Sequence, residues 1–279
     1  MLGRRRAKKS ELNKLIDSYE LGSFGNVVQE ALSTLRDPDS DLVSVGHVIS
    51  ADPGLSVQVL KIVNSPGFGL RHTVADPGHA SALMGRANLE SLLITAGVKN
   101  VLSDKRLRGF DPRRFWQSAA RRASVTRAFG NQMGLRDLAG LFTAALLQDV
   151  AIPLLCAWLG DEYGEVVERW HRGEASLHSL EQSKFGWDHA EVGGAIAEKW
   201  GLPSEIQKAI YGHHPSPDDP EPAPLPIVLG GLLPEVDWNR AYPAIIAMAK
   251  MVGKLDESDA QEVLEVGIEG AGEVMERIA

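Results

Sequence analysis

The sequence lacks the features that mark secreted and membrane-spanning proteins. Cys156 is the only cysteine among 279 residues, so no intrachain disulfide can form, which is typical of a reducing compartment. The apolar run at 152–159 is far shorter than the ~20 residues that cross a bilayer. Residues 1–10 are basic, but they are not followed by the apolar stretch of a secretory signal. We therefore expect a cytoplasmic protein with no membrane contact.

Positive charge is also scarce. The chain carries 29 lysines and arginines against 37 aspartates and glutamates, a formal net charge of -8. Binding to nucleic acid needs a local excess of positive charge against phosphate, and the nearest approach to one is the set Arg121, Arg122 and Arg127. We interpret these arginines as a solvated helix face and expect no nucleic-acid partner. The composition, 44% apolar and 24% charged, is that of an ordinary globular protein.

Patterns typical of β-strands are missing as well. No segment alternates apolar and polar residues, and no paired runs flank a turn of the Asn-Gly type. Apolar residues instead recur at the helical spacing of three and four residues, so the sequence predicts an all-α protein. The expected helices, with Pro153 kinking or breaking the sixth, cover residues 23–36, 41–50, 54–63, 88–102, 115–133, 138–159, 188–200, 203–213, 241–255 and 258–278.

Three stretches depart from this helical pattern. Residues 1–10 predict a basic, flexible tail. The polar stretch 103–111 predicts a boundary between two helical parts of the chain. Residues 215–226 contain six prolines, which favours an extended loop because proline disrupts a helix interior.

One acidic residue lies where an isolated charge is costly. Asp149 interrupts an apolar stretch, and a buried carboxylate needs a partner or a metal ion. His189 begins one predicted helix, and His213 and His214 end the next. Together these side chains offer the nitrogen and oxygen ligands that hold Zn, Mn or Fe. Paired histidines at a helix end also bind free carbonyls without any metal, so both interpretations stay open.

Several short motifs follow one another along the chain. They are Asp-Pro-Asp-Ser-Asp-Leu (37–42), Val-Ile-Ser-Ala-Asp-Pro-Gly-Leu-Ser (48–56), Val-Leu-Lys-Ile-Val-Asn-Ser-Pro (59–66), Phe-Trp (115–116), Phe-Thr-Ala-Ala-Leu-Leu-Gln-Asp (142–149), residues 181–186, Asp-His-Ala-Glu-Val-Gly (188–193), Lys-Trp-Gly-Leu-Pro (199–203) and His-His (213–214). In this order and spacing the series resembles the HDOD domain, the HD-related output domain of bacterial signalling proteins. The resemblance covers about residues 12–255.

The resemblance implies a two-lobed, multi-helix fold. The HDOD domain would cover residues 11–255, divided into an N-terminal helical lobe at about 11–103 and an HD-like helical lobe at about 111–255. The C-terminal helices would then occupy residues 256–279.

The related HD phosphohydrolases hold one or two metal ions that activate water, and the resemblance implies where their ligands would fall here. The first histidine would lie near Ser118, the histidine of the His-Asp doublet at Gln148, and the last acidic ligand near Lys250. All three ligands are lost at these positions, which argues against a two-metal centre.

The four remaining ligands match Asp149, His189, His213 and His214. They would suffice for one divalent transition metal. The other interpretation, which we favour, is a polar cluster without a cofactor, in which Asp149 accepts hydrogen bonds from the histidines or from Lys250.

The loss of these ligands decides which function we expect. We expect a non-enzymatic output or scaffold module of bacterial signal transduction. It would keep a degenerate HD pocket and act through a signalling protein partner or a small ligand. The alternative is a metal-dependent phosphohydrolase that acts on a nucleotide or cyclic dinucleotide.

Overall fold

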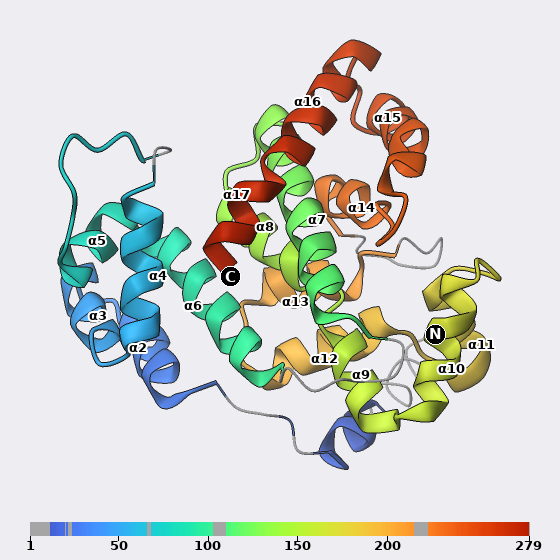
Figure 1. The fold of residues 1–279 in the computed structure, drawn as a ribbon, viewed down its shortest axis with the longest axis horizontal. Coiled ribbons are helices and arrows are strands. Elements are labelled where there is room, and N and C mark those ends of the chain that lie inside the picture. Colours follow the sequence, from blue (N-terminus) through green and yellow to red (C-terminus); the bar gives the residue numbers. More distant parts are fainter. Residues whose placement is uncertain are drawn as a thin grey trace. The chain divides into compact units, whose positions relative to one another are not determined.

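The structure is a computed structural model that describes residues 12–19, 21, 24–65, 68–102, 110–214 and 223–278. These residues form helices and their connecting segments, with no β-strand among them (Figure 1). The all-α prediction is therefore confirmed. The predictions for the tail 1–10, for most of the boundary 103–111 and for most of the loop 215–226 lie outside the described residues.

The chain divides into two compact units, which we describe separately. The small unit comprises residues 22–103 and 273–279. The large unit comprises residues 1–21 and 104–272.

The described residues of the segment 22–103 form five helices of the small unit, and three of these helices begin at an aspartate cap. Asp41, Asp52 and Asp76 each accept hydrogen bonds from backbone N–H groups in the following first turn, where a helix leaves its donors free. Two helices approach closely at glycines, since a Cβ on Gly46 would lie 2.4 Å from the Cα of Gly78. The helices are α2 (Asn26–Arg36), α3 (Leu42–Ile49), α4 (Pro53–Val63), α5 (Pro77–Met84) and α6 (Arg86–Val101).

The large unit carries every candidate site residue. Its longest described helix is α7, Pro112–Gln132, which begins at the cap Asp111 with proline in the first helical position, as helix starts favour. The others are a helical segment at 12–17, α8 (Leu138–Leu147), α9 (Ala151–Leu159), α10 (Asp161–His171), α11 (Leu177–Phe185), α12 (His189–Lys199), α13 (Ser204–Tyr211), α14 (Leu225–Gly231), the 3-10 turn η2 (Trp238–Ala241), α15 (Tyr242–Met251) and α16 (Glu257–Glu269). The last helix, α17 (Ala271–Ile278), belongs to the large unit only at residues 271–272, and its remaining residues belong to the small unit.

The apolar stretch Leu138–Leu159 is two helices. It is long and apolar enough to cross a membrane by length and composition alone, but 72% of its most apolar window is buried inside the protein. A turn at residues 148–150 separates the two helices. The helix is therefore interrupted before Pro153, the position where the sequence predicts the break. Pro153 lies in the first turn of α9, where its missing N–H has no helical partner to lose. This break puts Asp149 in a turn between two buried helices.

Helices α12 and α13 pack closely because α12 presents two glycines to α13. A Cβ on Gly193 would lie 3.0 Å from Cγ2 of Ile210, and one on Gly194 would lie 2.9 Å from Cβ of Tyr211. A capping box formed by Asp188 and Glu191 begins α12, and it fixes the position of His189.

Two predicted segments near the C-terminus need correction. The helix expected at 258–278 is the two helices α16 and α17, because α16 ends at Gly270. The expected proline-rich loop ends early, because α14 begins at Leu225. Pro226 occupies its first turn, the part of a helix that tolerates proline.

Candidate functional site

Asp149 pairs with an arginine that the sequence analysis assigned to the surface. Arg122, on α7, donates from Nη1 to Oδ2 of Asp149. Its Nε donates to the carbonyl of Leu233 at 3.1 Å. Arg122 is only 7% exposed, so its interpretation as part of a solvated face is wrong. A buried guanidinium is stable here because it faces a carboxylate and a carbonyl.

The pKa of Asp149 reflects this environment. Burial alone would raise the pKa of the carboxyl group, but the Arg122 guanidinium and the nearby imidazoles of His189 and His213 hold it well below its usual range. Asp149 is therefore ionised at neutral pH, and its carboxylate lies close to the guanidinium of Arg122 and to the rings of His189 and His213.

His189 lies at the centre of the cluster. Its Nδ1 lies 2.6 Å from Oε2 of Glu181, and its Nε2 lies 2.9 Å from Nε2 of His214. Oδ1 of Asp149 lies 3.4 Å from the same Nε2. Burial acts to lower the pKa of His189, but the charges of Glu181 and Asp149 and their hydrogen bonds raise it to about 10. His189 is therefore an imidazolium that donates to Glu181 and to the neutral ring of His214.

Glu181, on α11, is a member of the cluster that sequence reasoning missed. Its carboxylate is fully buried. It accepts hydrogen bonds from the hydroxyl of Tyr163, from Nδ1 of His189 and from the backbone N–H of His189 at 3.0 Å. The buried charges thus form two pairs, Arg122 with Asp149 and His189 with Glu181, whose sum is zero.

One ring nitrogen of His213 is buried and has no hydrogen-bond partner among the described residues. The Nδ1 atom of this histidine lies 2.7 Å from the carbonyl of Ile210 and donates to it. Its Nε2 is buried without a partner and lies 3.3 Å from Oδ1 of Asp149. Two such atoms face each other favourably only when a proton or a cation lies between them.

One tetrahedral metal ion fits this arrangement. The ring nitrogens of His189, His213 and His214 lie within 4.8 Å of one another, and Oδ1 of Asp149 lies 3.3–3.4 Å from two of them. Ligands at ~2.0–2.1 Å from a tetrahedral zinc lie about 3.3 Å apart. Binding would require His189 to lose its Nε2 proton, because metal ligands must be deprotonated.

A second ion does not fit, because the other carboxylate oxygen of Asp149 is bound to Arg122. Ser118 and Gln148 are buried nearby, and neither Oγ of Ser118 nor Oε1 of Gln148 has a hydrogen-bond partner among the residues that the structure describes. Lys250 is not where the resemblance placed it. Its side chain on α15 is 45% exposed and donates to Oε2 of Glu257 at 2.6 Å. The cation beside Asp149 is therefore Arg122.

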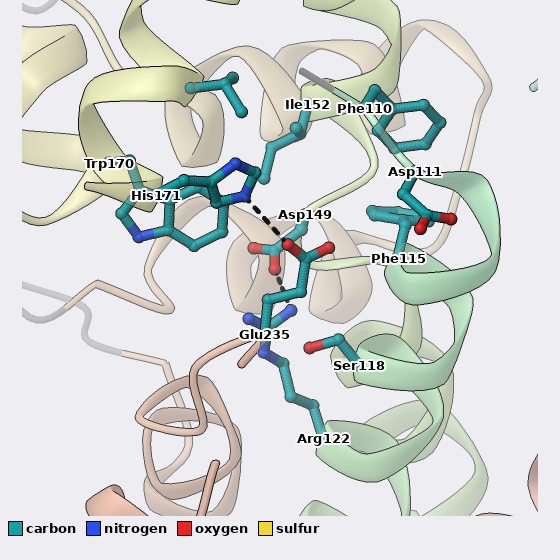
Figure 2. Close-up of a pocket in the computed structure, with 11 residues that line it drawn as sticks. Phe110, Asp111, Phe115, Ser118, Arg122, Asp149, Ile152, Trp170, His171 and Glu235 are labelled. Atoms are coloured by element: carbon teal, nitrogen blue, oxygen red, sulfur yellow. Dashed lines mark hydrogen bonds and ion pairs between the residues drawn. The ribbon is translucent and has the colours of Figure 1, made fainter. Parts of the chain in front are cut away.

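A pocket opens beside Asp149, within the large unit. Phe110 and Phe115 form one side of it and Trp170 the other, with Glu235 near Asp149 (Figure 2). The pocket thus joins an aromatic rim to a charged floor. Its lining is completed by Asp111, Ser118, Arg122, Ile152, Val167 and His171.

Comparison with known sequences identifies a family. A sequence profile of the HDOD domain matches residues 21–216, which include His213 and His214 but not Lys250. A protein of Treponema pallidum (strain Nichols), named "Uncharacterized protein", is 27% identical over 196 residues. The match covers 69% of this chain and 37% of the relative, so this chain spans little more than a third of that protein's length.

Solved structures share the fold. An HDOD domain protein of unknown function from Geobacter sulfurreducens has a TM-score of 0.73 at 19% identity, covering 98% of this chain and 96% of its own. A "Putative phosphohydrolase" from Shewanella amazonensis SB2B has a TM-score of 0.73 at 21% identity, with coverages of 96% and 98%. A "Putative signal transduction protein" from Marinobacter aquaeolei VT8 has a TM-score of 0.71 at 19% identity, with coverages of 95% and 60%. At these identities the likeness concerns the fold alone.

Proposed function

The chain belongs to the HDOD domain family, and from this premise we propose that it is a non-enzymatic module of bacterial signal transduction. In this role its degenerate HD pocket supports the binding of a protein partner or a small ligand, and the protein works in the cytoplasm. The observation that carries the proposal is the buried ion pair of Arg122 and Asp149.

The ion pair bears on catalysis because metal-dependent hydrolysis needs a cation that binds water and lowers its pKa towards neutrality. A guanidinium neutralises a carboxylate but has no vacant orbital for water, and it stays protonated. Arg122 therefore neutralises the charge of Asp149 but cannot activate a water molecule as a metal ion would. Ser118 and Gln148, the neighbouring positions, add no charged ligand.

A metal-dependent phosphohydrolase is the alternative, and one observation favours it. The buried Nε2 of His213 lacks a hydrogen-bond partner and faces Asp149. Together with His189 and His214 these residues would hold one ion, which would act as a Lewis acid when bound. Four protein ligands complete a tetrahedral sphere, as in structural zinc sites, whereas catalytic sites keep one position open for water. This donor set therefore favours a structural ion over a catalytic one.

Metal content and hydrolysis, measured on the same preparation, distinguish the two functions. The protein is purified without chelator, its metals are measured by mass spectrometry, and it is incubated with bis(p-nitrophenyl) phosphate and a cyclic dinucleotide plus Zn²⁺, Mn²⁺ or Fe²⁺. We expect no turnover above that of the His213→Gln variant, whatever the metal content. The matched control is His72→Gln, an exposed histidine of the small unit. Metal-dependent turnover that H213Q abolishes and H72Q keeps would overturn the proposal.

A further inference from the structure

The pocket beside Asp149 has a lining that suits one class of ligand. Its enclosed volume is about 20 Å³, enough for a group the size of a water molecule or an ammonium head, so the alkyl part of a ligand would lie in the open mouth along the aromatic rim. We propose that this pocket binds a small organic cation, an alkylammonium ion of a few carbons. The inference rests on the proposed binding role, because it names the ligand class of that pocket.

The charges of the lining favour a cation over an anion. Three carboxylates, Asp111, Asp149 and Glu235, line the pocket with a single arginine, Arg122. Arg122 is already paired with Asp149 and bound to the carbonyl of Leu233. An incoming phosphate or carboxylate would meet Asp111 and Glu235 with no unpaired arginine or lysine among the lining residues. A cation gains attraction from both, and such attraction strengthens where water is partly excluded.

Glu235 keeps one oxygen available for a ligand. His171 Nε2 lies 3.3 Å from Oε2 of Glu235, whereas Oε1 has no hydrogen-bond partner among the described residues. Arg121 does not cover this oxygen, because it donates to the backbone carbonyl of Glu235 at 3.3 Å. Its guanidinium carbon lies 5.6 Å from the ring centre of Trp238, outside the pocket lining. An ammonium group at Oε1 would thus complete the contacts of the carboxylate.

The aromatic rim adds a second attraction for cations. Phe110 and Phe115 pack at a tilt with ring centres 5.5 Å apart, and Trp170 faces them from the other side of the pocket (Figure 2). Aromatic faces attract cations through their quadrupoles, most strongly in the case of tryptophan. The same rings also bury the alkyl part of the ligand.

A buried hydroxyl at the pocket floor points independently to a missing polar ligand. Ser118 is 2% exposed, and its Oγ has no hydrogen-bond partner within the described part of the chain, although such groups are nearly always paired when buried. Figure 2 shows it beside Arg122 among the residues of the lining. An ammonium N–H entering the pocket would supply the donor that this oxygen lacks.

Calorimetric titration with matched probes tests the inference on the full chain. The probes are n-butylammonium chloride, 1-butanol, sodium butyrate and inorganic phosphate, all at one ionic strength. We expect n-butylammonium to bind with a Kd of about 1 mM or lower, corresponding to about 4 kcal/mol. Butanol should bind at least ~5-fold more weakly, because it lacks the charge–aromatic and charge–carboxylate attractions. Butyrate and phosphate should give no binding heat.

Two variants and one control locate the binding. Glu235→Gln removes the charge at nearly unchanged shape and should weaken n-butylammonium binding at least ~5-fold, and Trp170→Leu should weaken it ~2–5-fold. Glu257→Gln makes the same change at an exposed residue outside the pocket and should leave the Kd unchanged. Circular dichroism confirms that each variant is folded, and W170L provides the test where E235Q does not fold.

Three results would overturn the inference: no n-butylammonium binding below 10 mM, tighter binding of butyrate or phosphate, or equal weakening by E235Q and E257Q. The proposed binding role fails on a different readout, metal-dependent turnover. If the protein neither hydrolyses phosphodiesters nor binds n-butylammonium, the organic-cation inference is wrong, whereas the proposed non-enzymatic role still stands.

Discussion

At the scale of residues, the floor of the pocket depends on charges that cancel in pairs. Arg122 with Asp149, and His189 with Glu181, place four buried charges at short range. Removing one member of a buried pair leaves an uncompensated charge, which costs far more than the pair itself contributes. The stability of the large unit should therefore respond sharply to single charge changes here.

The first prediction concerns Arg122. The Arg122→Met variant leaves Asp149 buried and ionised, so we expect the free energy of unfolding to fall by ~3–5 kcal/mol. The double variant Arg122→Met/Asp149→Leu removes both charges and should recover much of this loss. Urea denaturation followed by circular dichroism measures both values.

The matched control for Arg122 is Arg169→Met. Arg169 pairs with Glu174 at 2.8 Å, but its side chain is 44% exposed, and exposed pairs contribute only ~0–1 kcal/mol. Losses of similar size in R122M and R169M would contradict the prediction.

The second prediction concerns pH and His189. The pKa of His189 is raised to about 10 in the folded state, above the ~6.5 of an unfolded histidine. The stability that its charged form contributes is therefore complete below pH 6.5, and it is lost as the pH rises towards 10. The loss should reach up to ~1.4 kcal/mol per pH unit, the value for one proton.

Urea denaturation of the wild type and of His189→Gln, at several pH values from 6.5 to 9, isolates this contribution. The wild-type free energy of unfolding should decline relative to that of H189Q as the pH rises. A difference between the two proteins that stays constant across this range would show that His189 is neutral in the folded state.

The members of this cluster were not equally predictable from sequence. Asp149 stands out because it is the one charge within an apolar stretch, and its need for a partner pointed to the histidines. The sequence also contained an indication that Arg122 is buried, because the apolar residues Ala119, Ala120 and Ala123 lie close to it in the chain. All three alanines are buried in the structure. Glu181 opens one of the motifs of the family resemblance, residues 181–186, but no ligand role was assigned to it, since a lone glutamate is typical of a helix surface.

At the scale of elements, close helix contacts set the geometry of the histidines. His189 begins α12, and His213 and His214 follow α13, so the distance between these helices decides whether the rings meet. Sequence predicted this pair of helices. It did not predict α10 and α11, which supply Tyr163 and Glu181, although Tyr163, Val166 and Val167 of α10 have the apolar spacing of a helix with one buried face.

The third prediction concerns Gly194. Alanine favours a helix interior over glycine by about 1 kcal/mol, but its Cβ would lie 2.9 Å from Cβ of Tyr211. The two helices must move apart, so we expect Gly194→Ala to lower the free energy of unfolding by ~1–3 kcal/mol. The same shift should change the NMR signals of the His189 and His214 rings.

Gly272→Ala is the control for this change, because Gly272 lies in α17 and a Cβ there meets nothing within 4 Å. We expect G272A to be neutral or stabilising by up to ~1 kcal/mol. A G194A protein as stable as G272A would mean that α12 and α13 are less closely packed than described.

At the scale of the whole molecule, the fold class followed from sequence because helical spacing runs through both units. The site was harder, because its parts come from helices far apart in the chain: α7, the turn before α9, α11, α12 and the end of α13. A resemblance aligns positions one by one. The resemblance therefore assigned Lys250 to the site. It gave no role to Arg122, which corresponds to none of the metal ligands and which supplies the positive charge beside Asp149.

Net charge and the placement of the arginines lead to the last prediction. The chain carries -8 overall, and the three arginines in the middle of α7, Arg121, Arg122 and Arg127, do not form a free basic face. Arg122 is buried, Arg121 is partly buried against Trp238, and Arg127 lies over the ring of Phe142 at 5.5 Å. Affinity for DNA comes largely from released counterions and falls steeply with salt. We therefore expect fluorescence anisotropy to show no binding of a labelled 20-base-pair duplex at 50 mM salt, and binding that weakens at 200 mM salt would contradict this.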